Sequence, residues 1–189
     1  STLMRSSAAS DVYKRQIRTF VLQGTLNFTR YFFKIRQKRK FVIGKHHREI
    51  AAALDKVLCG EITRLIINIA PRYGKTELAV KNFIAEGLAI NPKAKFIHLS
   101  YSDDLARDNS RGVQDIINEP EYRRIFPATI PTSTNTKKWY TTEGGGLYAV
   151  SSAGQVTGFG AGLVDEEEND ELAKEVEELD GLNLSLIHI

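Results

Sequence analysis

The chain has a single cysteine and no long hydrophobic run, and both features exclude classes of protein. Because Cys59 is the only cysteine among 189 residues, an internal disulfide framework is excluded. We expect Cys59 to be a helix residue rather than a nucleophile. No apolar run approaches the roughly 20 residues that span a bilayer, and the N-terminal residues lack the apolar core of a secretory signal. The sequence predicts a soluble, intracellular protein with no membrane partner.

The net charge is small, but the charges are unevenly placed. The whole chain carries +3, while residues 165–180 hold ten acidic residues and one lysine, a local charge of −9. The rest of the chain therefore carries +12. A basic body fits a polyanionic partner such as nucleic acid, although charge alone does not identify one. The length suits one domain.

The pattern of a strand, a loop and a helix surrounds Gly74, Lys75 and Thr76. A run of branched apolar residues at 65–69 is typical of a buried strand. Apolar residues then recur at helical spacing after the loop: Leu78, Ala79, Phe83 and Ile84. A phosphate-binding loop needs this order, because backbone amides and the N-terminus of the helix must face the phosphates.

The residue types in this loop predict a site for ATP and Mg²⁺. Gly74 allows close approach of the backbone, Lys75 reaches the β and γ phosphates, and the Thr76 hydroxyl holds Mg²⁺. Ile69 stands where the common pattern has its first glycine. The predicted nucleotide-binding residues are Pro71, Arg72, Tyr73, Gly74, Lys75, Thr76 and Glu77. The alternative is an ordinary turn with a surface lysine.

Other segments predict an α/β fold with a mostly parallel sheet and helices on both faces. A helix through residues 50–58 ends near Gly60, residues 95–100 form a strand, and Ser102 or Asp103 caps the next helix. Residues 139–150 read as a hairpin. Basic and aromatic residues interleave at 28–45, which indicates either contact with a nucleic-acid backbone or a solvated helix face.

With these segments in order, the chain resembles the ATPase domain of the large terminase subunits, the motors that pump DNA into the capsids of tailed phages. The similarity covers about residues 25–165. Its motifs lie at 44–47, 60–76, 99–106 and 154–162. The form Pro-Arg-x-Gly-Lys-Thr is more specific than the bare triplet. Terminases often lack the first glycine of the loop, so Ile69 fits this family.

The resemblance implies a P-loop NTPase that couples ATP hydrolysis to DNA translocation in the host cytoplasm. Lys75 and Arg72 would be the catalytic residues, with Arg72 facing the phosphates or sensing hydrolysis, and Thr76 would hold the metal. The implied partners are double-stranded DNA, the portal protein and the small terminase subunit, with the chain in a homo-oligomeric ring on the capsid. His46 and His47 lie where the family has an adenine-proximal segment, although we favour a structural role for both.

The resemblance also implies that the ATPase domain is incomplete. Residues 1–16 and 183–189 resemble translated sequencing-adapter sequence, so we expect them to be non-native, or residues 1–16 to be disordered. Residues 17–164 would form the partial ATPase domain and residues 165–182 an acidic insert or linker. Too few apolar residues precede Asp165 and Glu166 for a buried strand. We therefore expect the catalytic carboxylates and the family's nuclease domain to lie beyond this chain, which would hydrolyse ATP weakly.

Two other functions stay open at this point. A helicase-like P-loop ATPase shares the strand, loop and helix, and the full-length sequence would separate it by the absence of a nuclease. A basic nucleic-acid-binding module without catalysis would contain the Gly-Lys-Thr triplet by chance. Nucleotide-binding assays at several salt concentrations separate that case.

Overall fold

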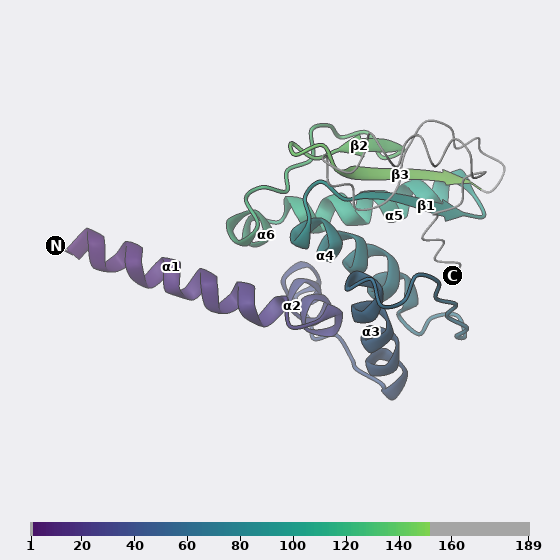
Figure 1. Cartoon of the computed structure of the whole chain (residues 1–189), viewed down its shortest axis with the longest axis horizontal. Coiled ribbons are helices and arrows are strands. Elements are labelled where there is room, and N and C mark those ends of the chain that lie inside the picture. Colours follow the sequence, from purple (N-terminus) through teal and green to yellow (C-terminus); the bar gives the residue numbers. More distant parts are fainter. Residues whose placement is uncertain (1, 152–189) are drawn as a thin grey trace.

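The computed structural model describes residues 2–151, with side chains from residue 11 onward. Helices α1 (Thr2–Val21), α2 (Thr25–Gln37) and α3 (Lys45–Leu58) come first along the chain. They are followed by η1 (Glu77–Asn82), α4 (Phe83–Ile90), β1 (Lys95–Ser100), α5 (Asp103–Asn118), α6 (Pro120–Ile125), β2 (Lys138–Tyr140) and β3 (Gly146–Ser151). Figure 1 shows the sheet along one side and α1 extending away from the body.

Helix α1 includes residues 2–16, which the sequence marks as a non-native or disordered terminus. The C-terminal part of α1 packs on the body, where Ile17 and Val21 join the core. Arg18 donates a hydrogen bond from Nη1 to the Ile125 carbonyl at 3.2 Å, and its guanidinium lies over the Phe126 ring. That residues 1–16 are foreign to the natural protein stays a prediction.

The sheet has three strands in the order β1-β3-β2, so the α/β prediction is confirmed. Strand β1 pairs with β3 in parallel, and β2 pairs with β3 antiparallel with Trp139 opposite Leu147. The strand predicted at 95–100 and the hairpin at 139–150 are therefore confirmed. The sheet is mixed rather than mostly parallel, because half of its pairings come from the hairpin.

The described helices cover one face of this sheet. Phe96 of β1 makes an edge contact with Phe83 of α4 at 6.5 Å between ring centroids, and His98 is hydrogen-bonded to Asn109 of α5 at 3.0 Å. Since residues 96 and 98 point the same way along a strand, α4 and α5 lie on the same side (Figure 1). Within residues 2–151 the prediction of helices on both faces is therefore wrong.

Residues 65–69 do not form the buried strand that their sequence predicts. They belong to no strand of the described sheet, and only Ile66 is assigned to an isolated bridge. Exposure alternates along this segment, with Ile66 85% exposed while Leu65 and Ile67 pack against the core. A branched apolar run favours extended backbone, but it does not determine which neighbour that backbone pairs with.

The helix predicted after residue 74 is confirmed, with a local difference in its winding. Helical backbone continues from residue 75 to Ile90, and η1 within it is a π-helical turn. Leu78, Ala79, Phe83 and Ile84 are all buried, as their spacing predicts. Asn82 donates from Nδ2 to the Glu77 carbonyl at 2.7 Å, which adds a side-chain bond across the wide turn. Such turns are rare and are frequently found at functional sites.

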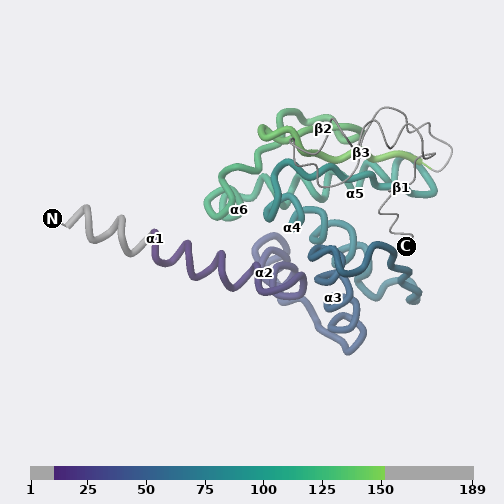
Figure 2. The backbone as a smooth tube through the Cα atoms, in the orientation of Figure 1, coloured from purple at the N-terminus to yellow at the C-terminus, as the bar shows by residue number. Residues whose placement is uncertain are grey.

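Helix α2 runs antiparallel alongside η1 and α4. Near its start, Thr25 lies beside Glu86 of α4, and near its end Arg36 forms an ion pair with Glu77 of η1 at 2.9 Å. Between these two contacts, Thr29 is buried on α2 and Asn82 is buried on η1. Figure 2 shows α2 between α1 and α3, below α4. The basic and aromatic helix α2 therefore supports the loop helix along its length.

Candidate phosphate-binding site

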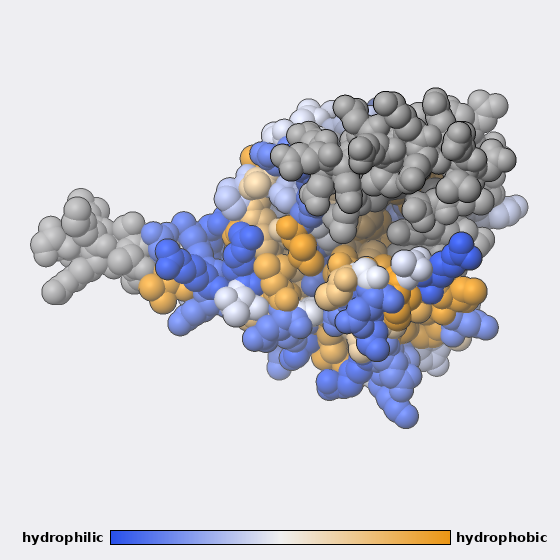
Figure 3. Space-filling model, in the orientation of Figure 1, coloured by the Kyte–Doolittle hydropathy of each residue, from blue (hydrophilic) through white to orange (hydrophobic). Residues whose placement is uncertain are grey.

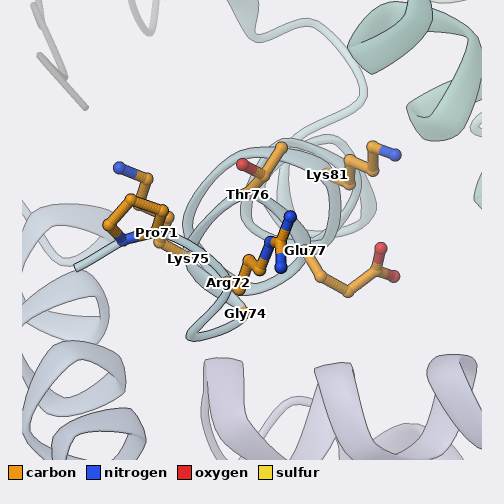
Figure 4. A pocket seen from close by; sticks show the side chains of 7 residues that line it. All are labelled: Pro71, Arg72, Gly74, Lys75, Thr76, Glu77 and Lys81. Atoms are coloured by element: carbon orange, nitrogen blue, oxygen red, sulfur yellow. The ribbon is translucent and has the colours of Figure 1, made fainter. Parts of the chain in front are cut away.

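The loop before η1 lines a pocket of about 370 Å³ (Figure 4). Six of the seven predicted nucleotide-binding residues line it, and Lys81 joins them. The lining residues are Pro71, Arg72, Gly74, Lys75, Thr76, Glu77 and Lys81. Tyr73 does not line the pocket, because its carbonyl and its ring are both engaged with histidines behind the loop.

The backbone of the loop has a shape that suits an anion. Arg72 and Gly74 both have positive φ, 69° and 73°, on either side of Tyr73. The Gly74 carbonyl accepts the first helical hydrogen bond, from the Leu78 amide at 3.0 Å. The amides of the first helical turn then have no carbonyl partner within the helix, and such groups bind anions at helix N-termini. A positive φ at a residue other than glycine is uncommon and marks Arg72 as constrained.

His47 holds this loop from below. Its Nδ1 accepts a hydrogen bond from the Gly44 amide at 2.9 Å, so the ring proton must sit on Nε2. Nε2 then donates to the Tyr73 carbonyl at 2.9 Å. His47 is buried, and a side chain on Gly74 would bring a Cβ within 2.9 Å of its Nε2. The structural role that we favoured for His47 fits these contacts.

The surroundings of His47 keep its ring neutral. Burial lowers the pKa of His47 below its usual value, and the neighbouring His46 lowers it further, against a smaller opposing effect of the Tyr73 carbonyl. The His46 and His47 rings lie 3.9 Å apart between centroids, and the His46 ring makes an edge contact with Tyr73. A neutral His47 can accept from Gly44 and donate to Tyr73 at the same time, which a charged ring cannot do.

The carboxylate of Glu77 is already bonded within the protein. Its Oε1 accepts from Arg36 Nη1 at 2.9 Å and from Asn82 Nδ2 at 3.0 Å. The side chains of Arg36 and Glu77 are only 10% and 18% exposed, so water screens this ion pair weakly. Glu77 was predicted as a nucleotide-binding residue, and these bonds make it a support of the loop. The sequence did not predict that Arg36 and Asn82 bond Glu77. Arg36 is 41 positions away in the chain, and Asn82 reaches Glu77 across the π-helical turn.

Three cationic side chains line the pocket. Arg72 is exposed, whereas Lys75 and Lys81 are half-buried. Lys81 crosses α5 at Gly112, where an added Cβ would lie 2.7 Å from its Cδ and Cε. Because Arg36 balances Glu77, the pocket carries an excess of positive charge, which suits a polyanionic ligand. No pattern in the sequence singled out Lys81, since its place depends on the winding of the π-helical turn.

Metal binding at this site rests on Thr76. Thr76 lines the pocket beside Lys75, as predicted. The described residues contain no cluster of three or more histidine, cysteine, aspartate or glutamate side chains that would hold a metal by themselves. A Mg²⁺ ion held by one hydroxyl together with phosphate oxygens and water would not require such a cluster. The donor set is therefore compatible with Mg²⁺ that arrives with a nucleotide.

Ser102 and Asp103 have structural partners at the carboxyl ends of β1 and β3. Ser102 Oγ accepts from the Leu105 amide at 3.2 Å, which makes it the N-cap of α5. Asp103 Oδ1 accepts from the Ser151 amide at 3.1 Å, and its bonds to Ser151 lower the pKa of its carboxyl. Asp103 thus ties α5 to the end of β3. Asp165 and Glu166 lie outside the described residues.

Comparisons with models of known protein families, with curated proteins and with solved structures found no match for this chain. No helix among residues 2–151 is both long and apolar enough to cross a membrane.

Proposed function

We propose that the chain is the ATP-binding part of a DNA-packaging motor of the large terminase type, with a P-loop that binds ATP and Mg²⁺. The observation that carries the proposal is the pocket at residues 71–77, where a constrained loop, a helix N-terminus and two lysines meet. Gly74 has the positive φ and the close neighbours that exclude a side chain. This geometry supports a site for an anion. The loop motif adds that the anion is a nucleotide, and the resemblance adds that the protein is a packaging motor.

Within this proposal Lys75 binds the phosphates, Arg72 stabilises or senses them, and Thr76 holds Mg²⁺. The first-turn amides donate hydrogen bonds to the remaining phosphate oxygens. Hydrolysis requires in addition a carboxylate that positions water, and none lines the pocket among the described residues apart from the bonded Glu77. Weak hydrolysis by this chain, with the nuclease elsewhere in the natural protein, remains part of the proposal. So do the capsid-bound ring, the portal and small-subunit partners, and the host cytoplasm.

The Lys75→Ala variant tests the nucleotide site. A charge-assisted contact is worth about 1.5 to 3 kcal/mol, so we expect ATP affinity to fall roughly ten- to a hundredfold. Titration calorimetry with Mg²⁺ and ATP measures the change. Lys56→Ala is the matched control, because Lys56 is exposed on α3 and does not line the pocket. Equal affinities for the wild type and the Lys75 variant, with equal circular dichroism spectra, would remove the P-loop assignment.

The DNA partner is supported by an exposed run of three cations after α2. Lys38, Arg39 and Lys40 are all exposed, whereas Arg36 is bonded to Glu77. Replacing the three with glutamine should weaken DNA binding equally for all sequences and reduce the salt slope by up to about three units. Fluorescence anisotropy over a series of salt concentrations measures the slope. An unchanged slope would assign these residues to an ordinary solvated face.

The two alternative functions predict different results in these experiments. A nucleic-acid-binding module without catalysis predicts salt-dependent DNA binding and no ATP binding by the wild type. A helicase-like ATPase predicts ATP binding, and a natural full-length protein that lacks a nuclease. The pocket favours a nucleotide-binding protein over the first alternative and does not separate the two motors.

A further inference from the structure

The exposed cations Lys38, Arg39 and Lys40, here called the tribasic segment, connect α2 to the loop that precedes α3. Lys38 ends α2 with a left-handed backbone, φ 54°. The lower end of the molecule, where this connection lies in Figures 1 and 2, is coloured hydrophilic in Figure 3. The segment is short. Arg36 before it contacts the start of the helix that follows the phosphate-binding loop, and Phe41 after it contacts the loop itself.

The contact before the tribasic segment is the Arg36–Glu77 ion pair. Arg36 lies two residues before Lys38, and Glu77 directly follows Thr76 in the chain. The pair measures 2.9 Å and is largely shielded from water, so both side chains are held in place. Asn82 bonds the same Glu77 oxygen and spans the π-helical turn. A displacement of Arg36 would therefore reach the first turn of the loop helix.

The contact after the tribasic segment is made by Phe41, the residue that follows Lys40. A Cβ built on Gly74 would lie 3.4 Å from Cζ of the Phe41 ring, so this ring packs directly against the loop. Phe41 also makes an edge contact with His47, at 4.9 Å between centroids, and His47 holds the Tyr73 carbonyl. Phe33 of α2 packs on Phe41 at 5.2 Å. Phe41 and Arg36 thus support the loop from two sides.

We propose that the tribasic segment binds a phosphodiester backbone and that its occupancy raises the affinity of the loop for nucleotide through Arg36 and Phe41. The inference rests on the proposed function, since it assigns a regulator to the same site. Arg36 and Phe41 are positioning residues that act through Glu77, Gly74 and His47. Because the coupling is reciprocal, nucleotide strengthens the binding of the backbone by the same factor.

We expect nucleic-acid binding to raise, rather than lower, the affinity for nucleotide, because Arg36 and Phe41 both contact the loop or its helix. A backbone held across Lys38–Lys40 restricts the segment between Arg36 and Phe41, and so holds both side chains against the loop. Nucleotide binding to a loop that is already held loses less conformational entropy. Repulsion between the two ligands is weakened by solvent at the exposed segment, because charges are screened over about 8 Å at physiological salt.

The test compares ATP affinity with and without a short double-stranded DNA of arbitrary sequence at saturating concentration. We expect DNA to raise the affinity of the wild type about five- to tenfold, in the lower range of known couplings. The Lys38→Gln, Arg39→Gln, Lys40→Gln variant should lose this increase and keep its ATP affinity without DNA. The matched control is Arg30→Gln with Lys34→Gln, two exposed cations on α2 itself, which should keep the increase.

The coupling through Arg36 and Phe41, here called the relay, is tested by Arg36→Met and, separately, by Phe41→Leu. Each should reduce the increase toward onefold while the salt-dependent binding of DNA persists. Unchanged or reduced ATP affinity of the wild type on adding DNA would overturn the inference, and so would an increase that survives both relay substitutions. Failure of the wild type to bind ATP at all would instead remove the proposed function. If a relay variant does not fold, as judged by its circular dichroism spectrum, the tribasic variant and its control decide whether the inference holds.

Discussion

The Glu86→Gln variant is expected to lose the fall in stability that the wild type shows between pH 6.5 and pH 8, above the range in which the lowered pKa values of His47 and His98 act in the opposite direction. Glu86 is 1% exposed on α4, and burial raises the pKa of its carboxyl from 4.5 to about 8. The hydroxyl of Thr25 lowers this pKa and the nearby Asp55 raises it, both by less than burial does. The described residues facing Glu86 from α2, α3 and α6 include Thr25, Asp55 and Tyr122, none of which is cationic.

The direction of the effect follows from which state holds the proton. Between pH 5 and pH 8 the folded protein keeps a proton on Glu86 that the unfolded chain has released. The contribution of Glu86 to the free energy of unfolding therefore falls as pH rises, by about 1.4 kcal/mol per pH unit, or about 4 kcal/mol across this window. Below pH 6.5 the lowered pKa values of His47 and His98 offset part of this fall. Glutamine has no proton to lose, so the variant should be the more stable of the two near pH 8.

Urea unfolding of both proteins at several pH values measures this slope. Glu61→Gln is the matched control, because Glu61 is exposed and its replacement should leave the slope unchanged. A wild type whose stability is flat between pH 6.5 and pH 8 would contradict the prediction, and so would a Glu86→Gln variant with the wild-type slope in that range.

The Trp139→Ala variant is expected to lose about 3 to 5 kcal/mol of stability, the usual range for removing a large buried aromatic. Trp139 is 1% exposed on β2, and its Nε1 donates to Ser110 Oγ of α5 at 2.9 Å in a buried position. Removal of the indole would leave a cavity between the hairpin and α5, and the Ser110 hydroxyl would lose its partner.

The neighbouring Tyr140→Ala variant is the control for Trp139. Tyr140 is 39% exposed and points to the other side of the strand, so its truncation should cost less than about 1.5 kcal/mol. Urea denaturation gives both values. Equal losses for the two variants would show that the indole does not hold the hairpin on α5.

The polar seam between α2 and the loop helix connects these stability arguments to the site. Four buried side-chain oxygens along it make no hydrogen bond of good geometry among the described residues: Thr25 Oγ1, Thr29 Oγ1, Asn82 Oδ1 and Glu86 Oε2. The Thr25 hydroxyl nevertheless lies close enough to Glu86 to lower the pKa of its carboxyl. Asn82 also bonds Glu77 at the pocket. Since buried polar groups are normally paired, this seam is the least satisfied part of the described core.

Local sequence was enough for the loop helix, β1 and the hairpin, because each depends on spacing within a few residues. Leu78, Ala79, Phe83 and Ile84 recur at helical intervals and are buried on one side of the helix. Six of the seven residues predicted for nucleotide binding line one pocket, since a loop between fixed ends keeps neighbours in sequence together. The same reasoning failed at 65–69. An apolar run there favours extended backbone, but it does not determine which strand that backbone pairs with.

By itself the sequence determined the loop motif, the helical periods, the basic run and the capping residues, because propensity and side-chain chemistry act locally. Only the tertiary structure decided that Arg36 bonds Glu77, that His47 supports Tyr73, and that Phe41 packs on Gly74. It also decided the protonation of Glu86, since a pKa depends on what surrounds the carboxyl in space. The three contacts join residues 26 to 41 positions apart, and no local pattern encodes such distances.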